Sequence, residues 1–155
     1  MFTIREELGT VNGLTITFVG DLKFGRTVHS LAKLLQHYHV RINFASPPQL
    51  SMPTAVRDSL KKAGIEVKEY HELTPDLVAS SDVLYCTRVQ KERFEDLNEF
   101  EKLKDSFIID HSVLKNAKSH MVVMHPLPRN AEIGEEVDYD QRAAYFRQVW
   151  IACSA

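Results

Sequence analysis

Residues 14–34, LTITFVGDLKFGRTVHSLAKL, decide the fold, because they contain a strand, a glycine turn and a helix in that order. Apolar β-branched and aromatic residues are frequent over positions 14–19, as in a buried parallel strand. Gly20 ends this run. After Gly25 the apolar residues recur at helical spacing, at positions 28, 31, 32, 34 and 35. The stretch therefore predicts a strand that leads through a turn into a helix.

The turn between this strand and this helix carries positive charge. Lys23 lies inside the turn and Arg26 lies where the helix begins. A strand that ends in a glycine turn and opens a helix presents backbone N–H groups and the positive end of the helix dipole to a ligand. We therefore expect an anion to bind here.

Composition limits the class of protein. A chain of 155 residues suffices for one domain with a sizeable core, and 44% apolar with 26% charged residues is ordinary for a globular protein. The net charge of −2 argues against a general nucleic-acid surface. Cys86 and Cys153 lack metal-ligand spacing and the histidines are scattered, so we expect reduced thiols, no metal and no cofactor.

The chain start is charged, with the sequence MFTIREELG, where a signal peptide needs an apolar core. Apolar runs also stay below membrane-spanning length. We expect a cytoplasmic protein that does not interact with membranes.

Five further apolar segments predict strands, over residues 40–44, 65–67, 82–85, 107–109 and 121–124. Helical patterns lie between them at 53–63, 75–79 and 97–103, and a short amphipathic segment covers 1–8. Strands that alternate with helices predict an α/β fold with a doubly wound parallel sheet, Rossmann-like and three-layered, in a single domain.

Ligands of such folds bind at the carboxyl ends of the strands. Cationic and amide side chains follow three of the predicted strands. We therefore expect three loops to meet at one edge of the sheet, carrying Lys23 and Arg26, then Arg88, Gln90, Lys91 and Arg93, and finally His125 and Arg129.

Other interpretations of these segments stay open. Gly20-x4-Gly25-Arg26-Thr27 is a degenerate P-loop, and FIID at 107–110 could imitate the strand whose aspartate holds magnesium. Arg in place of the P-loop Lys changes the geometry, which counts against nucleotide binding. The charged run 91–93 could be a solvated cluster, and a histidine one turn into a helix, like His29, is more often a packing residue than a catalyst.

Four segments together resemble aspartate carbamoyltransferases: VGDLKFGRTVHSL at 19–31, CTRVQKERF at 86–94, MVVMHPLPRNAEI at 121–133 and VDYDQRAAYFRQ at 137–148. The resemblance covers residues 2–148 and corresponds to the aspartate-binding half of that enzyme, in the type fused into eukaryotic multifunctional pyrimidine-synthesis proteins. The ornithine enzyme has H-C-L-P where this chain has HPLP at 125–128, which favours aspartate.

The resemblance implies transfer of a carbamoyl group from carbamoyl phosphate to the α-amine of L-aspartate, giving N-carbamoyl-L-aspartate and phosphate. Arg26 is then expected to hold the α-carboxylate, and Arg88 with Gln90 the β-carboxylate, since a guanidinium fork binds a carboxylate through two hydrogen bonds. Pro126 and Leu127 are expected to offer main-chain carbonyls to the reacting groups. The residues with substrate-binding or supporting roles are Lys23, Glu92 (orienting Arg88), Arg93, Arg129 and His29.

Two features depart from the family. The half that binds carbamoyl phosphate is absent, so residues 1–148 are expected to form the aspartate-binding domain of a larger homotrimeric enzyme. Residues 149–155, VWIACSA, do not resemble the long apolar helix that follows in the family, and we treat them as an atypical tail. Three functions therefore stay open: the aspartate-binding half, a non-catalytic binding or assembly domain, and a degenerate P-loop nucleotide binder.

Overall fold

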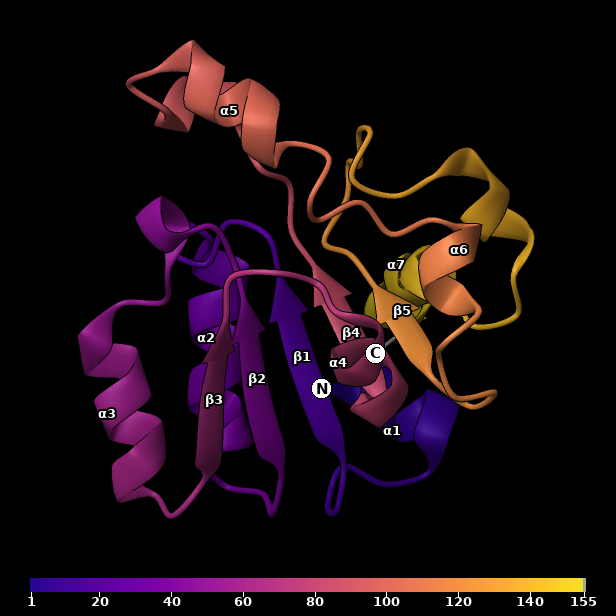
Figure 1. The fold of residues 1–155 in the computed structure, drawn as a ribbon. Coiled ribbons are helices and arrows are strands. Elements are labelled where there is room, and N and C mark those ends of the chain that lie inside the picture. Colours follow the sequence, from indigo (N-terminus) through magenta and orange to yellow (C-terminus); the bar gives the residue numbers. More distant parts are fainter. Residues whose placement is uncertain (155) are drawn as a thin grey trace.

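A five-stranded parallel sheet forms the centre of the computed structural model, which describes residues 1–154 (Figure 1). Its order is β3-β2-β1-β4-β5, so the chain starts in the middle and adds strands first on one side and then on the other. The predicted doubly wound α/β fold is confirmed. The strands are β1 (Thr15–Val19), β2 (Arg41–Ala45), β3 (Glu66–Tyr70), β4 (Val83–Cys86) and β5 (Val122–Met124).

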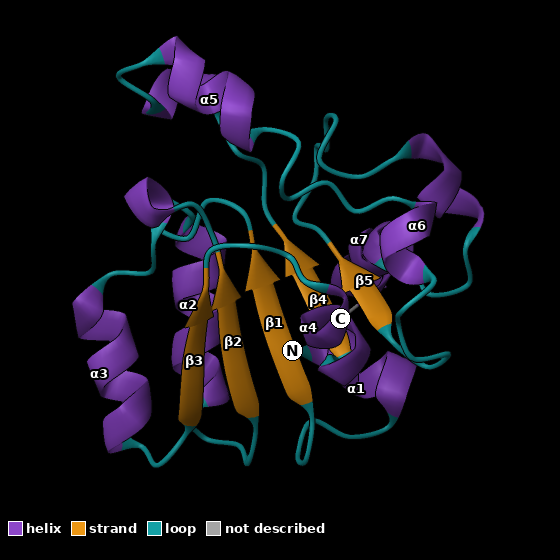
Figure 2. Ribbon diagram, in the orientation of Figure 1, coloured by secondary structure: helices purple, strands orange, loops and turns teal. Residues whose placement is uncertain are grey.

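Helices cover both faces of the sheet (Figure 2). Side chains of α1, α2 and α3 join the core on one face, while those of α4 and α6 join the core on the other. Helix α5 stands away from the sheet beyond the end of β4 (Figure 1). The helices are α1 (Phe2–Leu8), α2 (Arg26–Leu35), α3 (Thr54–Lys62), α4 (Pro75–Ser80), α5 (Leu97–Leu103), α6 (His111–Leu114) and α7 (Tyr145–Ser154), with 3-10 turns η1 (Pro48–Leu50), η2 (Lys91–Arg93) and η3 (Glu135–Tyr139). None of these helices, within the part of the chain described, is long and apolar enough to cross a membrane.

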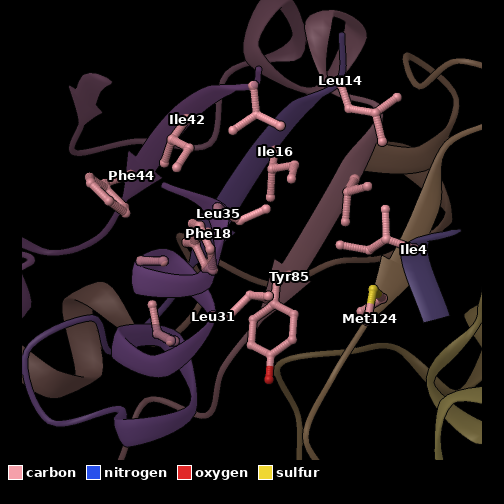
Figure 3. Packing of buried hydrophobic residues seen from close by; sticks show 14 of the residues in the cluster. Ile4, Leu14, Ile16, Phe18, Leu31, Leu35, Ile42, Phe44, Tyr85 and Met124 are labelled. Carbon is pink, nitrogen blue, oxygen red and sulfur yellow. The ribbon is translucent and has the colours of Figure 1, made fainter. Parts of the chain in front are cut away.

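Phe18 lies at the centre of the core beneath α2 (Figure 3). It is completely buried on β1, and its ring lies 5.7 Å from the rings of both Phe44 on β2 and Tyr85 on β4. Alternate residues of a strand point to opposite faces, so Val19 packs into the second core instead. Burial of both faces agrees with the β-branched and aromatic composition of β1, TITFV.

One sequence expectation needs correction. Phe107 and Ile109 are buried, but residues 107–109 form no strand of the sheet, because Ile109 makes only an isolated bridge with Ile133 in the loop after β5. The sheet therefore has five strands where we expected six. Residue 148, the expected boundary of the aspartate-binding domain, lies within α7, which runs from Tyr145 to Ser154.

Gly20 allows the first two site loops to approach each other. Its φ is +110°, and a Cβ built on it would lie 2.3 Å from the carbonyl oxygen of Thr87. Thr87 directly follows β4, and its N–H donates to the carbonyl of Val19 at 2.8 Å. The absence of a side chain at position 20 thus permits the loops after β1 and β4 to touch.

We expect Gly20→Ala to reduce the free energy of unfolding by at least about 3 kcal/mol, because it adds both backbone strain and a main-chain clash. Gly13→Ala is the matched control. Gly13 has φ +81° but nothing lies within 4 Å of its added Cβ, so its loss should be about 1 kcal/mol. Urea unfolding of both variants measures the difference, and equal losses would contradict the close approach at Gly20.

Candidate functional site

The loop after β1 is held by its own aspartate. The carboxylate of Asp21 accepts the backbone N–H groups of Lys23 at 3.1 Å and Phe24 at 3.0 Å. The N–H of Leu22 donates to the carbonyl of Leu50 at 3.0 Å. His29 on α2 contacts the carbonyl of Leu22 through Nε2 at 2.8 Å, so it supports the loop from behind. These hydrogen bonds hold the loop, and three of its backbone N–H groups are used within the protein.

This geometry argues against the P-loop interpretation. A P-loop needs free amides to cradle phosphates, whereas the N–H groups of Leu22, Lys23 and Phe24 already donate within the protein. Asp110, which that interpretation would make a magnesium ligand, instead caps α6 by accepting the N–H of Val113 at 2.9 Å. No group of three or more His, Cys, Asp or Glu in residues 1–154 is arranged to hold a metal.

Arg26 and Lys23 remain exposed at this end of the sheet. Arg26 is the first residue of α2, whose N-cap is Gly25 and therefore offers no side chain to the first-turn amides. An anion near Arg26 would meet both its guanidinium and the positive end of α2. We therefore expect an anion to bind at the helix start and not within the turn.

The loop after β4 presents Arg88 and Gln90 in fixed positions. Nε of Arg93 donates to the side-chain oxygen of Gln90 at 3.1 Å, which leaves the Gln90 amide nitrogen as a donor. The guanidinium of Arg93 lies 4.5 Å from the ring centre of Phe24, and Nζ of Lys23 lies 5.2 Å from the same ring. The loops after β1 and β4 thus pack together through a cation–π contact.

The loop after β5 contains a strained residue, Leu127, with φ +50°. Its N–H donates to Nδ1 of His125 at 2.8 Å, and Nε2 of the same ring lies 2.8 Å from the carboxylate of Glu132. His125 is only 1% exposed. Left-handed backbone at a leucine is costly and persists where surrounding contacts enforce it, as often happens in functional sites.

Asn130 joins the loop after β5 to the loop after β4. Its hydrogen-bonding pattern places the amide oxygen toward Arg88, whose Nε donates to it at 3.1 Å, while the amide nitrogen donates to the carbonyl of Arg129 at 3.1 Å. All three predicted loops therefore meet at the carboxyl edge of the sheet, and this central prediction is confirmed.

Glu92 lacks the contact expected of it, whereas Arg129 has a supporting role in its loop. Glu92 is exposed, and no hydrogen bond or ion pair described within residues 1–154 joins it to Arg88, whose Nε binds Asn130 instead. Arg129 points inward, where it donates to the carbonyl of Ile133 at 3.1 Å and pairs with Asp138. Arg129 therefore supports the loop and does not present its charge to a ligand.

Sequence reasoning missed Asn130 and Glu132 as parts of the site. Both lie in the HPLPRNAEI segment that carries the family resemblance, but polar residues in a proline-rich loop give no periodic pattern. The carboxylate of Glu132 accepts the N–H of Asn130 through both oxygens at 3.0 Å. A polar residue two positions before a glutamate does not predict a hydrogen bond between them. The contacts of Asn130 are evident only in the folded loop.

Burial acts to raise the pKa of Glu132, but hydrogen bonds from His125 and from the Asn130 N–H outweigh it and lower that pKa below the usual 4.5. A lowered folded-state pKa stabilises the protein above the unfolded value, and that contribution is lost as the pH falls through the folded value. We expect the free energy of unfolding of Glu132→Gln to be below that of wild type at pH 7 and to approach it below pH 4.5. A constant difference across a pH series of urea unfolding curves would contradict the assignment.

The comparisons with known proteins agree with this geometry. The family model described as aspartate/ornithine carbamoyltransferase, Asp/Orn binding domain, matches residues 12–150. The chain belongs to this family. The multifunctional protein pyrABCN of Emericella nidulans is 68% identical over 149 residues, which are 96% of this chain and 6% of that protein. The aspartate carbamoyltransferase catalytic subunit of Thermococcus kodakarensis is 48% identical over 150 residues, or 97% of this chain and 48% of that subunit.

Solved carbamoyltransferase structures share the fold. The catalytic subunit of M. jannaschii aspartate transcarbamoylase matches with a TM-score of 0.90 and 44% identity, over 96% of this chain and 48% of that one. Aspartate transcarbamoylase from Trypanosoma cruzi in complex with aspartate and phosphate matches with a TM-score of 0.84 and 44% identity, over 96% and 46%. This carbamoyltransferase domain thus spans about half the length of such catalytic chains and a small fraction of the multifunctional relatives.

Proposed function

We propose that this chain is the aspartate-binding half of an aspartate carbamoyltransferase of pyrimidine biosynthesis. The observation that supports the proposal is the meeting of the three loops at one edge of the sheet, next to the helix that Arg26 begins. These loops carry Arg88, Gln90, Pro126 and Leu127. Two arginines on the loops of adjacent parallel strands suit a ligand with two carboxylates at a fixed spacing.

Each side chain then has a role in binding aspartate. Arg26 and the start of α2 hold the α-carboxylate, while Arg88 and the amide nitrogen of Gln90 hold the β-carboxylate. The carbonyls of Pro126 and Leu127 accept N–H groups of the substrate amine, which orients the nitrogen lone pair. Lys23 adds positive charge beside them.

The reaction needs no nucleophile from the protein. The lone pair of the aspartate amine attacks the carbonyl carbon of carbamoyl phosphate, forming a C–N bond as the C–O bond to phosphate breaks. Phosphate leaves with the electron pair of that bond, and an amine proton passes to it. Catalysis in this half therefore consists of positioning and charge complementarity.

Exposed apolar side chains on two helices support the proposal that this chain packs against a carbamoyl phosphate-binding half. Phe2 on α1 is 54% exposed, and Val149 and Trp150 on α7 are 48% and 77% exposed. Helices α1 and α7 also line an apolar pocket that reaches Arg26 and Gln148. This surface fits a carbamoyl phosphate-binding half, and we propose that the complete enzyme is a cytoplasmic homotrimer.

Aspartate and asparagine together test the proposal. In an enzyme completed with a carbamoyl phosphate-binding half, asparagine should bind about 100-fold more weakly than aspartate, because it leaves one guanidinium facing a neutral amide. Calorimetric titration with both amino acids measures the ratio. Equal affinities would contradict the two-arginine site, and absence of binding by either would favour a non-catalytic assembly domain.

A further inference from the structure

A continuous chain of hydrogen bonds connects Arg88 to Leu127. Nε of Arg88 donates to the amide oxygen of Asn130 at 3.1 Å, and the backbone N–H of Asn130 donates to the Glu132 carboxylate at 3.0 Å. Glu132 contacts Nε2 of His125 at 2.8 Å, and Nδ1 of His125 accepts the N–H of Leu127 at 2.8 Å. The chain links the loop after β4 to the loop after β5.

The direction of each bond in this chain is fixed. A backbone N–H can only donate, so Nδ1 of His125 accepts from Leu127, and Nε2 carries the proton that is donated to Glu132. The Asn130 amide is held at both ends, because its nitrogen donates to the carbonyl of Arg129 while its oxygen accepts from Arg88. Rotation of any of these side chains would break its hydrogen bonds to the neighbouring groups, so the series of hydrogen bonds favours one geometry.

The contact at Nε decides how Arg88 can grip a ligand. With Nε bound to Asn130, a carboxylate can still bind end-on to the two terminal nitrogens of the guanidinium, and no hydrogen bond described within residues 1–154 uses those nitrogens. The contacting group is moreover a neutral amide. The Glu132 carboxylate accepts only the backbone N–H of Asn130 and not its side chain. The group in contact with the Arg88 guanidinium is therefore the uncharged side-chain amide of Asn130.

We propose that Asn130 is a positioning residue that aims the guanidinium of Arg88 at the β-carboxylate of aspartate. Glu132 and His125 connect Asn130 to Leu127. The same hydrogen bonds therefore orient both the guanidinium that binds the β-carboxylate and the Leu127 carbonyl that binds the amine. The inference rests on the proposed function and adds to it the residue that orients the grip. It also requires an amide at position 130, because a carboxylate there would neutralise Arg88 and compete with the substrate.

Three variants in the completed enzyme test this inference by steady-state kinetics. Asn130→Ala should raise the aspartate KM about tenfold, through loss of a hydrogen bond to a charged group, and leave the carbamoyl phosphate KM unchanged. Asn130→Asp should raise the aspartate KM further, although it keeps an acceptor for Arg88. Asn12→Ala is the matched control, because the Asn12 side chain also accepts a hydrogen bond, from the N–H of His39, at the opposite edge of the sheet.

A double mutant separates positioning from general loss of stability. If Asn130 acts through Arg88, Asn130→Ala should have no further effect on the aspartate KM in an Arg88→Ala background. An equal effect in both backgrounds would overturn the inference, as would an Asn130→Asp enzyme with a lower aspartate KM than Asn130→Ala. A completed wild-type enzyme that does not use aspartate would instead overturn the proposed function itself.

A second measurement does not depend on activity. NMR of the chain 1–155 follows solvent exchange of the Arg88 Nε proton, which the bond to Asn130 protects in the wild type. Exchange should accelerate at least about tenfold in Asn130→Ala and stay unchanged in Asn12→Ala. An unchanged exchange rate in Asn130→Ala would show that the two side chains are not joined, and would overturn the inference even if the kinetics could not be measured.

Discussion

Alone, this chain is expected to carbamoylate aspartate no faster than the uncatalysed reaction proceeds. In the proposed function it binds only one of the two reactants, and the solved catalytic chains that it resembles are about twice as long. Holding both reactants in a productive arrangement contributes roughly 7–11 kcal/mol to such transfers, and a single half forfeits that contribution. Weak binding of a dicarboxylate should nevertheless persist, because the three loops are held by contacts within the chain.

Mixing the purified chain with a separately produced carbamoyl phosphate-binding half provides the measurement. N-carbamoyl-aspartate should form only after the second half is added, with a rate that saturates as the halves associate. The second half alone is the control. Turnover by residues 1–155 before the addition would contradict the division of the active site between two halves.

The second large effect is expected for Arg88→Ala. Removing one partner of a buried, charge-assisted pair costs about 2–5 kcal/mol, and here the loss should fall on aspartate use. Carbamoyl phosphate binding should change little, because Arg88 does not contact it in the proposed arrangement. Steady-state kinetics with each substrate varied in turn separates the two effects.

Arg41→Ala is the control for this variant. Arg41 is also an arginine next to a strand, but it begins β2 at the amino edge of the sheet, where it is exposed and lies 4.0 Å from Glu66. Its replacement should leave both KM values unchanged. Unaltered aspartate kinetics in Arg88→Ala, or an equal loss in both variants, would contradict the role assigned to Arg88.

The segment around Gly20 was predictable because its signals are local. The apolar run of β1, the glycine turn and the periodic pattern of α2 occur in one stretch, and each reflects which faces are buried. The meeting of the three loops was also predictable, because parallel strands end at a common edge. The order of strands and loops along the chain therefore suffices to place Lys23, Arg88 and His125 near one another.

Residues 107–109 show where local signals fail. A short apolar run indicates burial but does not distinguish a sheet strand from a segment packed beneath a loop. Phe107 and Ile109 are buried, yet Ile109 pairs only with Ile133, in a loop that follows β5.

The contacts of Asn130 lay beyond sequence reasoning because they are polar and depend on the exact path of the loops. Arg88 is 42 positions away along the chain, and Glu92 was the nearer candidate on grounds of spacing. Leu127 has a left-handed backbone, and its N–H binds His125, which in turn contacts Glu132. No periodic sequence pattern predicts these contacts. Fold and general location could be predicted, while the orientation of each functional group required the structure.

The most direct test of the two-arginine site varies ligand and protein together. Aspartate, asparagine and isoasparagine, which carries the amide at the α position, are titrated into completed enzymes with wild-type, Arg26→Ala or Arg88→Ala sequence. Arg88→Ala should remove the preference for aspartate over asparagine and retain the preference over isoasparagine, and Arg26→Ala should do the reverse. Equal weakening of all three ligands by either variant would contradict the assignment of one arginine to each carboxylate.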